Sequence, residues 1–390
     1  MLVSKKIFYL LGILSILVFS CNSSYQVMHV SKNIVANEKS GFYYALPKTF
    51  IKVNFIVDQQ EEVKGPYSDF AKKYFGLNNV IAQNSMKYKI KAVNIETYAE
   101  ADSSQYYFVE CNDSKVGIQL NRLGNIKTVN PSINASSSIQ KQTETDSANS
   151  SNTDDYPELF KMYANSSLYE KTDTFYKPYK VYNSIIFEKI YKTSLIEKPT
   201  EQKVKEIADL ITKIKDNRFS LLIGDQEVND KKSIEFMYTE LQNLENEYMK
   251  LFTGITLNHT LTYQYIYLPE KDSTCNISKA ILCKFSAEKG IFDKSMPSGD
   301  PIYIQTKDNK STEAVNQFNN QKKKLQKGKQ GFYYRMPAYT TIDILSNNIL
   351  LQTSKQFIAQ LGVILSVPNN NSYLRYDENT GGLREIQIKN

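Results

Sequence analysis

Two acidic residues, Asp225 and Glu227, are the candidate pair for acid–base catalysis in this sequence. They lie in the segment IGDQEV, and glycoside hydrolysis uses two carboxyl groups on either side of a sugar bond. Acids in a loop after a helix are usually solvated, which is the competing interpretation. The sequence has no glycine-rich phosphate loop and no GxSxG motif, so nucleotide and serine-hydrolase chemistry lack support. We expect a non-catalytic protein, with a glycosidase of unrecognised type as the less favoured alternative.

Metal and nucleic-acid binding are not expected. The chain has two histidines, His29 and His259, and no HExxH or CxxC motif, so it lacks clustered metal ligands. His259 falls in an alternating segment and is expected to be a packed strand residue. The net charge of +7 is mild, and the lysines are spread along the chain, unlike the basic faces of nucleic-acid binders. We therefore expect no metal, no cofactor and no nucleic acid.

The cysteines allow one disulfide. Cys111, Cys275 and Cys283 remain once Cys21, which the start of the chain marks for another role, is set aside, and an odd number excludes a fully paired framework. Cys275 and Cys283, in STCNISKAILC, could bridge a hairpin in an oxidising compartment. Buried free thiols are the alternative, and Cys111 is consistent with a plain strand residue.

The start of the chain has the pattern of a lipoprotein leader. Lys5 and Lys6 precede an apolar run over residues 7–19. This run is too short to cross a bilayer and is typical of a signal peptide, here residues 1–20. It ends in VFSC, the pattern of a lipobox, in which the thiol of the cysteine becomes a diacylglyceryl thioether. We expect Cys21 to be lipidated, since two or more acyl chains anchor a protein stably. A secretory signal with an incidental cysteine is the competing interpretation.

Aromatic and basic side chains give two candidate binding surfaces. Tyr263, Tyr265 and Tyr267 share one face of an alternating segment. Such rings can stack on sugars, although core or cross-strand packing is the favoured interpretation. The segment QKKKLQKGKQ could contact anionic headgroups, with a solvated loop as the default, and its lysines are Lys322, Lys323, Lys324, Lys327 and Lys329.

Residue patterns also predict the elements that position these side chains. Alternating segments over residues 41–130 predict a β-rich N-terminal domain with one short helix, for which Gly76 is a plausible C-cap. A central region, residues 156–330, combines long strands with two amphipathic helical patterns. These patterns predict an antiparallel helical hairpin over residues 200–252, with Thr200 as its N-cap.

Two polar segments are not expected to join the core. Residues 21–40 are irregular and suit a tether between the membrane and the first domain. Residues 131–155 are rich in Ser, Thr and Asn and are expected to form a linker or long surface loop. Within that loop, Ser147 in the triplet DSA resembles a bacterial O-glycosylation acceptor, with an unmodified loop as the favoured alternative.

An internal echo relates the two ends of the chain. SGFYYALP at residues 40–47 returns as QGFYYRMP at residues 330–337, and each leads into an alternating run. We therefore expect a C-terminal β unit, residues 331–390, that echoes the N-terminal domain. Three further segments place a polar, glycine-containing turn between apolar alternations and predict β-hairpins, at Gly124, Gly290 and Gly382.

Five segments together carry a family resemblance. GFYYALPKT, KGPYSDFAKKYFGL, RFSLLIGD, LENEYMKLFTG and GFYYRMP occur in this order over nearly the whole mature chain. They resemble the lipoprotein family called domain of unknown function 4831, found in envelope proteins of Gram-negative anaerobes. The resemblance implies a secreted, tethered protein, and it supplies no activity, cofactor or catalytic residue.

These observations predict an α+β fold that is mostly antiparallel β, in repeated strand and hairpin units, with one central helical hairpin. We expect an outer-membrane lipoprotein, held in the membrane through Cys21, that acts as a structural or protein-interaction module for an unidentified envelope protein. No Asp or Glu directly follows Cys21, so we expect it to face the periplasm rather than the cell surface. A glycan-binding module with exposed tyrosines is the alternative.

Overall fold

A computed structural model describes the chain over residues 25–30, 40–111, 117–130, 157–160, 168–181, 184–224, 231–271, 277–325, 331–367 and 372–387. The fold is β-rich, and its strands pair antiparallel in all four sheets. This confirms the predicted mostly antiparallel α+β class. Within these ranges, none of the helices combines the length and the apolar character that a membrane crossing requires.

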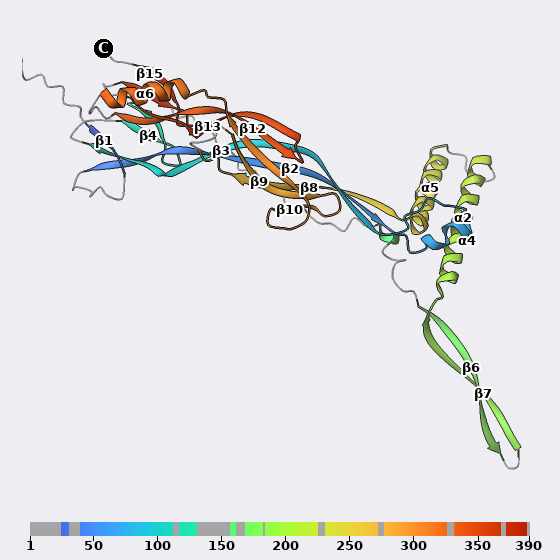
Figure 1. The fold of residues 1–390 in the computed structure, drawn as a ribbon. Helices are drawn as coiled ribbons and strands as arrows, with labels where there is room; N and C mark the ends of the chain where they lie inside the picture. The colour runs from blue at the N-terminus through green and yellow to red at the C-terminus, as the bar shows by residue number, and fades with distance from the viewer. Residues whose placement is uncertain are drawn as a thin grey trace, which may run out of the picture.

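Two sheets pack on each other to form the body of the molecule (Figure 1). The first has the strand order β1 (Tyr25–His29), β3 (Ser85–Cys111), β2 (Gly41–Val63) and β8 (Ile255–Tyr267). The second has the order β10 (Gly290–Asp293), β9 (Ile277–Ser286), β11 (Asp300–Asp308), β12 (Phe332–Ser346) and β13 (Ile349–Val367).

The main core lies between these two sheets. Alternate residues of β2 point inward and are completely buried, namely Ile51, Val53, Phe55 and Val57. They pack in one cluster with the isoleucines of β11 and β12. Burial of each such side chain stabilises the fold by about 1.5–3 kcal/mol. The period-two pattern of the sequence therefore gives both the strand and its buried face.

A third sheet covers a second core near the chain termini. Its strand order is β15 (Leu383–Gln387), β14 (Tyr373–Tyr376), β5 (Ile126–Val129) and β4 (Ile118–Leu120). Segments of the expected N-terminal and C-terminal units thus share one sheet. The echoed segments also meet here, since the Tyr333 backbone N–H donates to the Tyr44 hydroxyl at 2.9 Å and the Tyr44 ring contacts Phe332.

The three predicted hairpins are present. They are β4–β5, β9–β10 and β14–β15. Gly124 and Gly290 have φ of +76° and +78°. Residues with a Cβ atom rarely adopt this backbone conformation, whereas glycine adopts it readily. In the third hairpin Gly381 takes this role, with φ of +70°, rather than its neighbour Gly382.

The segment expected to be an irregular tether contains a strand. β1 pairs along the end of β3, from Tyr25 opposite Cys111 to His29 opposite Tyr107. The prediction is wrong here because Val27 is completely buried in the second core, and a strand of five residues, YQVMH, is too short to show a clear alternation.

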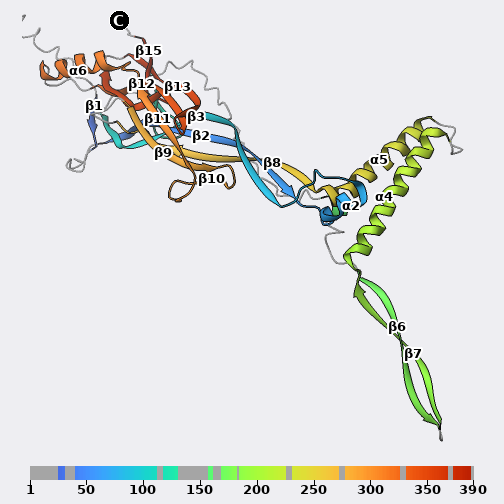
Figure 2. The same ribbon diagram turned by 45° about the vertical axis from the view of Figure 1, so that its right-hand side comes forward.

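The helices α2, α4 and α5 lie at the far end of the long β2–β3–β8 ribbon (Figure 2). The predicted short helix is present as η1 (Ser68–Phe70) followed by α2 (Ala71–Phe75), which ends at Gly76. Two longer helices, α4 (Thr200–Ile223) and α5 (Lys231–Thr253), contact each other and share a third core with α2. Pro199 is the N-cap of α4, not Thr200, which is already helical.

An additional helix, α6 (Glu313–Leu325), was not expected from the sequence. It contains Lys322, Lys323 and Lys324, so the prediction of a solvated loop is wrong for these three lysines. Lys327 and Lys329 lie outside the described residues. The sequence of α6 is mostly polar, so it contains too few apolar residues to give a recognisable helical pattern.

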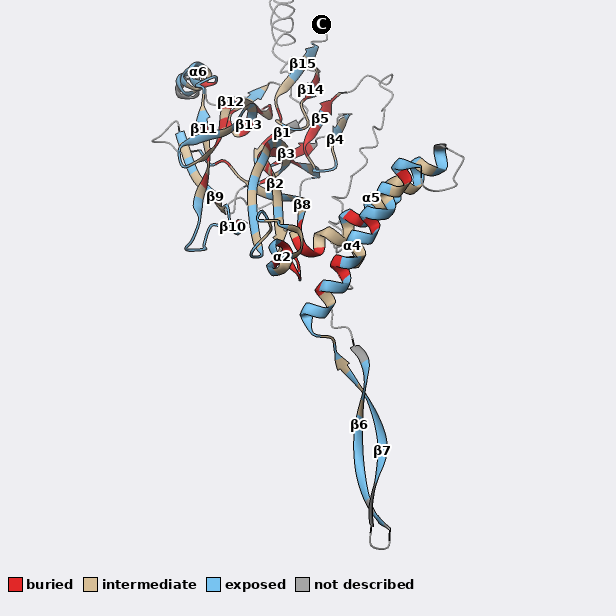
Figure 3. Ribbon diagram, turned by 90° about the vertical axis from the view of Figure 1, so that its right-hand side faces the viewer, coloured by how far each residue is buried: buried red, intermediate tan, exposed pale blue. Residues whose placement is uncertain are grey.

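A two-stranded hairpin projects from the base of α4, beyond the rest of the molecule (Figure 3). It consists of β6 (Leu168–Val181) and β7 (Ser184–Glu197), paired along their full length. Each strand has the other as its sole neighbour in the described sheets. We call this hairpin the arm.

Candidate functional site

A polar pocket of about 320 Å³ opens on the body where α6 crosses the strands. Its walls come from β3, β12, β13, α6 and the segment after β8. The side chains with hydrogen-bonding groups at its lining are Gln105, Lys271, Asn316, Asn319, Arg335 and Gln360. Among the described lining residues there is no carboxylate, and the two cations are Lys271 and Arg335; the charge of Arg335 is paired with Asp102 behind the lining.

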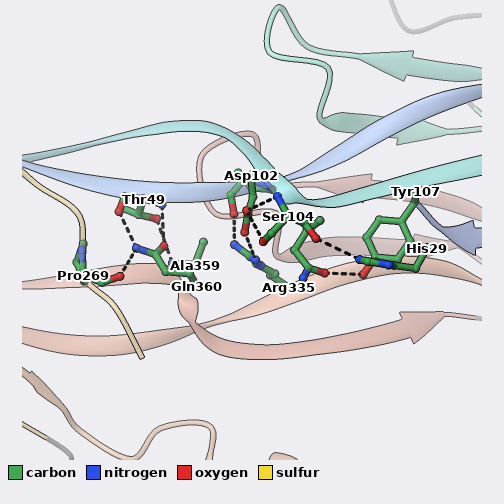
Figure 4. Close-up of polar contacts among 11 residues, drawn as sticks. His29, Thr49, Asp102, Ser104, Tyr107, Pro269, Arg335, Ala359 and Gln360 are labelled. Atoms are coloured by element: carbon green, nitrogen blue, oxygen red, sulfur yellow. Dashed lines mark hydrogen bonds and ion pairs between the residues drawn. The ribbon is translucent and has the colours of Figure 1, made fainter. Parts of the chain in front are cut away.

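Arg335 is the buried charge of this site. Its side chain is 5% exposed, and one guanidinium nitrogen donates to Oδ2 of Asp102 at 2.5 Å. Another nitrogen donates to the backbone carbonyl oxygen of Pro47 at 2.6 Å. The arginine is placed by β12, whose register shifts between Met336 and Ala338 at the intervening proline. Arg335 therefore ties β12 to both β2 and β3 (Figure 4).

Asp102 is the partner carboxylate and is fully engaged. It accepts hydrogen bonds from the Ser104 backbone N–H at 3.0 Å and from the Ser104 hydroxyl at 2.7 Å. Burial alone would raise the pKa of this carboxyl, but the hydrogen bonds from Ser104 and Arg335 outweigh burial and lower the pKa. Asp102 is thus a permanent anion at neutral pH and does not serve as a proton acceptor for a ligand.

The Gln360 amide makes a second group of hydrogen bonds behind the pocket, beside those of Arg335 and Asp102. Its Oε1 accepts from the Thr49 backbone N–H at 2.8 Å, and its Nε2 donates to the carbonyl oxygens of Thr49 at 2.9 Å and Pro269 at 3.0 Å. The segment after Pro269 also carries Lys271, whose ammonium donates to the Gly362 carbonyl oxygen at 3.1 Å. Gln360 therefore fixes the pocket wall, whereas Lys271 is exposed and can reach a ligand.

His29 extends the network to the sheet edge. It contacts the Ser104 carbonyl oxygen at 3.2 Å and packs edge-on against Tyr107 at 5.2 Å between ring centroids. The Tyr107 hydroxyl in turn donates to Oε1 of Gln105 at 3.0 Å, at the pocket lining. The histidine expected in a free tether thus supports one wall of the pocket.

The tyrosines singled out from the sequence lie elsewhere. Tyr263, Tyr265 and Tyr267 share the inner face of β8, half-buried against the main core. Burial raises the pKa of Tyr265 to about 12. His259 shares this face and is also half-buried, as expected of a packed strand residue.

The remaining predicted site residues are mostly beyond the structure. Cys283 is a buried free thiol of the main core, and burial raises its pKa to about 12. Its proposed partner Cys275 lies outside the described residues. So do the lipidation, glycosylation and carboxylate-pair residues Cys21, Ser147, Asp225 and Glu227. Within the described ranges, no three His, Cys, Asp or Glu side chains gather as metal ligands would.

The sequence prediction missed the pocket residues, although one signal was available. In the echo, Arg335 occupies the position that Ala45 occupies in the first copy. A charged residue at the equivalent of a buried alanine, within an apolar strand, indicates a paired buried charge. Asp102, Gln360 and Lys271 carry no comparable local pattern.

Comparison with known proteins identifies a family but no characterised relative. The family model described as Domain of unknown function (DUF4831) matches residues 40–172 and 165–371. No curated protein and no solved structure matches the chain. The match spans most of the sequence, including β2, α4, α5 and the strands that build the pocket. The chain therefore belongs to the DUF4831 family.

Proposed function

We propose that this protein is a non-catalytic, lipid-anchored module of the cell envelope that binds a protein partner, and that its pocket receives an acidic side chain of that partner. The observation that carries the proposal is the composition of the pocket lining, in which the ammonium of Lys271 joins four amides and the ion-paired Arg335, without a described carboxylate. A carboxylate accepts hydrogen bonds only, so it complements this lining.

The residues that line the pocket have two roles: some are held in place by partners in the protein, and others lie at the rim, where they can contact a ligand. Arg335 and Gln360 are held by backbone and side-chain partners, so the site is preformed. Lys271 together with Asn316 and Asn319 of α6 supplies donors at the rim. A hydrogen bond to a charged group contributes about 1.5–3 kcal/mol, so this rim can select an acidic partner.

A binding role accounts for the pocket better than a hydrolytic one. Asp102 is the acid nearest to Arg335, and its oxygens are occupied by Ser104 and Arg335. General acid–base catalysis needs a group whose pKa lies near the working pH, and the pKa of Asp102 is lowered instead.

The proposed anchoring joins the lipid to the body of the molecule, because three residues separate Cys21 from Tyr25 at the start of β1. Cys21 carries the acyl chains in an outer membrane, and the body faces the periplasm. In the same proposal, residues 200–252 form one antiparallel helical hairpin of α4 and α5, which spaces the arm from the body. The Arg218–Glu245 ion pair at 2.7 Å supports this pairing of the two helices.

Binding of defined acidic probes tests the pocket. Hexaglutamate should bind the full chain in isothermal titration calorimetry and hexaglutamine should not. Lys271→Glu should weaken hexaglutamate binding at least tenfold, while Lys355→Glu, an exposed lysine on β13, should leave it within twofold. Equal loss in both variants, or no binding of hexaglutamate at millimolar concentration, would contradict the proposal.

An acidic glycan is the second candidate ligand, favoured by the four amides, which also suit sugar hydroxyls. Trigalacturonic acid separates the two classes. If it binds through Lys271 and hexaglutamate does not, the pocket is a glycan site and the protein-partner proposal is wrong.

The anchor has its own test. Mass spectrometry of the mature protein should find Cys21 as the first residue with a thioether-linked diacylglyceryl group, and Cys21→Ser should release the protein from membranes. A membrane-bound Cys21→Ser protein would contradict the anchor. Protease treatment of intact cells should spare the protein if it faces the periplasm.

A further inference from the structure

The arm exposes apolar side chains on both of its faces. On one face Tyr176, Phe187 and Tyr191 are 61%, 63% and 64% exposed, and on the other Phe175 and Ile190 are 52% and 38% exposed. No third described strand or helix packs on the arm. A two-stranded hairpin alone is at best marginally stable in water, so a further strand packed on the arm would stabilise it.

The strand edges decide what completes it. Each strand of the arm has one unpaired edge of backbone N–H and C=O groups, which hydrocarbon cannot satisfy but a further strand can. β6 carries Pro178, which lacks a backbone donor and protects an edge from strand addition. β7 has no proline, so its edge is the one open for pairing.

The charges of β7 select a self-pairing. In an antiparallel pair, two directly opposed residues either both point their backbone N–H and C=O groups toward the partner strand or both point them away. This orientation alternates along β7. When β7 pairs with a second copy of itself about a two-fold axis, an even-numbered residue therefore lies opposite an even-numbered one. Two such registers set opposite charges against each other, Glu188 with Lys192 and Lys189 with Glu197. The first is centred on Ile190 and pairs residues 184–196, whereas the second pairs only residues 189–197 and leaves Phe187 uncovered.

We infer that β7 pairs antiparallel with β7 of a second copy of this chain, about a two-fold axis at Ile190, and that the two arms form one four-stranded sheet. This inference is independent of the ligand of the pocket. It concerns a different surface, at the opposite end of the molecule from the body (Figure 1).

One face of the four-stranded sheet has complementary rows. In each arm Phe175 is opposite Ile190, Lys177 is opposite Glu188, and Asp173 is opposite Lys192. The inferred register therefore makes a central apolar row of Phe175 and Ile190 from both copies. On each side of it runs a charged row in the order Lys177, Glu188, Lys192 and Asp173, whose signs alternate across the dimer. Opposite-charge pairs across strands stabilise a sheet, and like charges destabilise it.

The second face supports the same register. Lys189 lies over the Tyr176 ring of its own arm, with its ammonium 6.0 Å from the ring centroid. The inferred pairing places the exposed Tyr191 of the second copy on the other side of Lys189. The ammonium then lies between two aromatic rings, an arrangement that cation–π attraction favours.

Charge reversal tests the pairing. The full chain in mild detergent should be dimeric in sedimentation velocity at micromolar concentration. Glu188→Lys and Lys192→Glu should each raise the dimer dissociation constant at least tenfold, and the double variant should return within threefold of wild type. Rescue would identify the contact between copies. In the double variant the lysine introduced at position 188 still faces Lys177 and the glutamate introduced at position 192 still faces Asp173 within one arm, so only the pairing between the two copies regains opposite charges.

Cysteine cross-linking tests the register separately. Ile190→Cys should give a disulfide-linked dimer on oxidation, because the two residues meet at the axis. Ser194→Cys should not exceed the wild-type background, since the two copies of residue 194 would lie about 26 Å apart along the strands. A monomer at all concentrations, singly reversed variants that still dimerise, or cross-linking through residue 194 instead of 190 would each overturn the inference.

Discussion

Removing one member of the Asp102–Arg335 pair should destabilise the protein far more than removing both. The two side chains are 12% and 5% exposed, so either survivor would be a charge in a nearly dry environment. Breaking such a pair costs about 3–5 kcal/mol, whereas replacing both partners is often close to neutral. We therefore expect Asp102→Asn and Arg335→Met each to lower the free energy of unfolding by about 3–5 kcal/mol.

The double variant carries the decisive measurement. It leaves no buried charge, and its remaining cost comes mainly from the Pro47 carbonyl oxygen, which loses the donor seen at 2.6 Å. An unsatisfied buried acceptor costs about 1–3 kcal/mol. The coupling between the two substitutions should therefore reach about 3 kcal/mol or more.

Urea unfolding of the four proteins, followed by circular dichroism and by tyrosine fluorescence, measures this coupling, and the absence of tryptophan keeps the emission simple. Arg384→Met is the matched control. It breaks an ion pair with Asp377 in which the arginine is 63% exposed, and exposed pairs contribute about 0.2–1 kcal/mol. If the effects of Asp102→Asn and Arg335→Met add within about 0.5 kcal/mol, the description of a coupled buried pair is wrong.

Three further predictions concern protonation and backbone geometry. The pKa of Asp102 is lower in the folded than in the unfolded protein. Its ionised carboxylate therefore stabilises the fold fully above the unfolded pKa of about 3.9, and this stabilisation is lost as the pH falls through the folded pKa. The difference in free energy of unfolding between wild type and Asp102→Asn should shrink when unfolding is measured from pH 6 down to pH 2. The Cys283 thiol, whose pKa burial raises to about 12, should stay unmodified by iodoacetamide at pH 8 in the native protein and react in urea, as peptide mass spectrometry will show, and native modification would contradict its burial. Gly254→Ala should lower the thermal midpoint, because Gly254 has φ of +85° and an added Cβ would lie 2.6 Å from the Val63 carbonyl oxygen. Gly76→Ala is the control. Gly76 has φ of +68° with open space around it, so this substitution should cost only the backbone strain of about 1 kcal/mol.

Sequence periodicity predicts the long elements of this fold well. The alternation of Ile51, Val53, Phe55 and Val57 gives a strand with a buried face, and the glycine turns locate three hairpins. These features are local, because neighbouring residues alone determine the face of a strand or the hand of a turn. β1 and α6 were missed because their short or polar sequences are ordered by tertiary contacts with β3 and the body.

The candidate site could not be predicted in the same way. Arg335 and Asp102 are 233 positions apart, and Gln360 and Thr49 are 311 apart. Their pairing depends on which strands become neighbours, and no periodic pattern in one sequence encodes that. The arm is a further case, since the sequence predicts long strands in the central region but does not reveal that no other described strand pairs with β6 and β7.

The third sheet has a consequence for how the chain acquires its structure. Its strands come from residues 118–129 and 373–387, and the core beneath it combines Val27 near the start with Leu374 near the end. Folding cannot complete this part until almost all of the chain is available. Contacts so distant along the chain also slow folding. The third sheet should therefore form late, because β5 cannot pair with β14 until the last strands of the chain have been made.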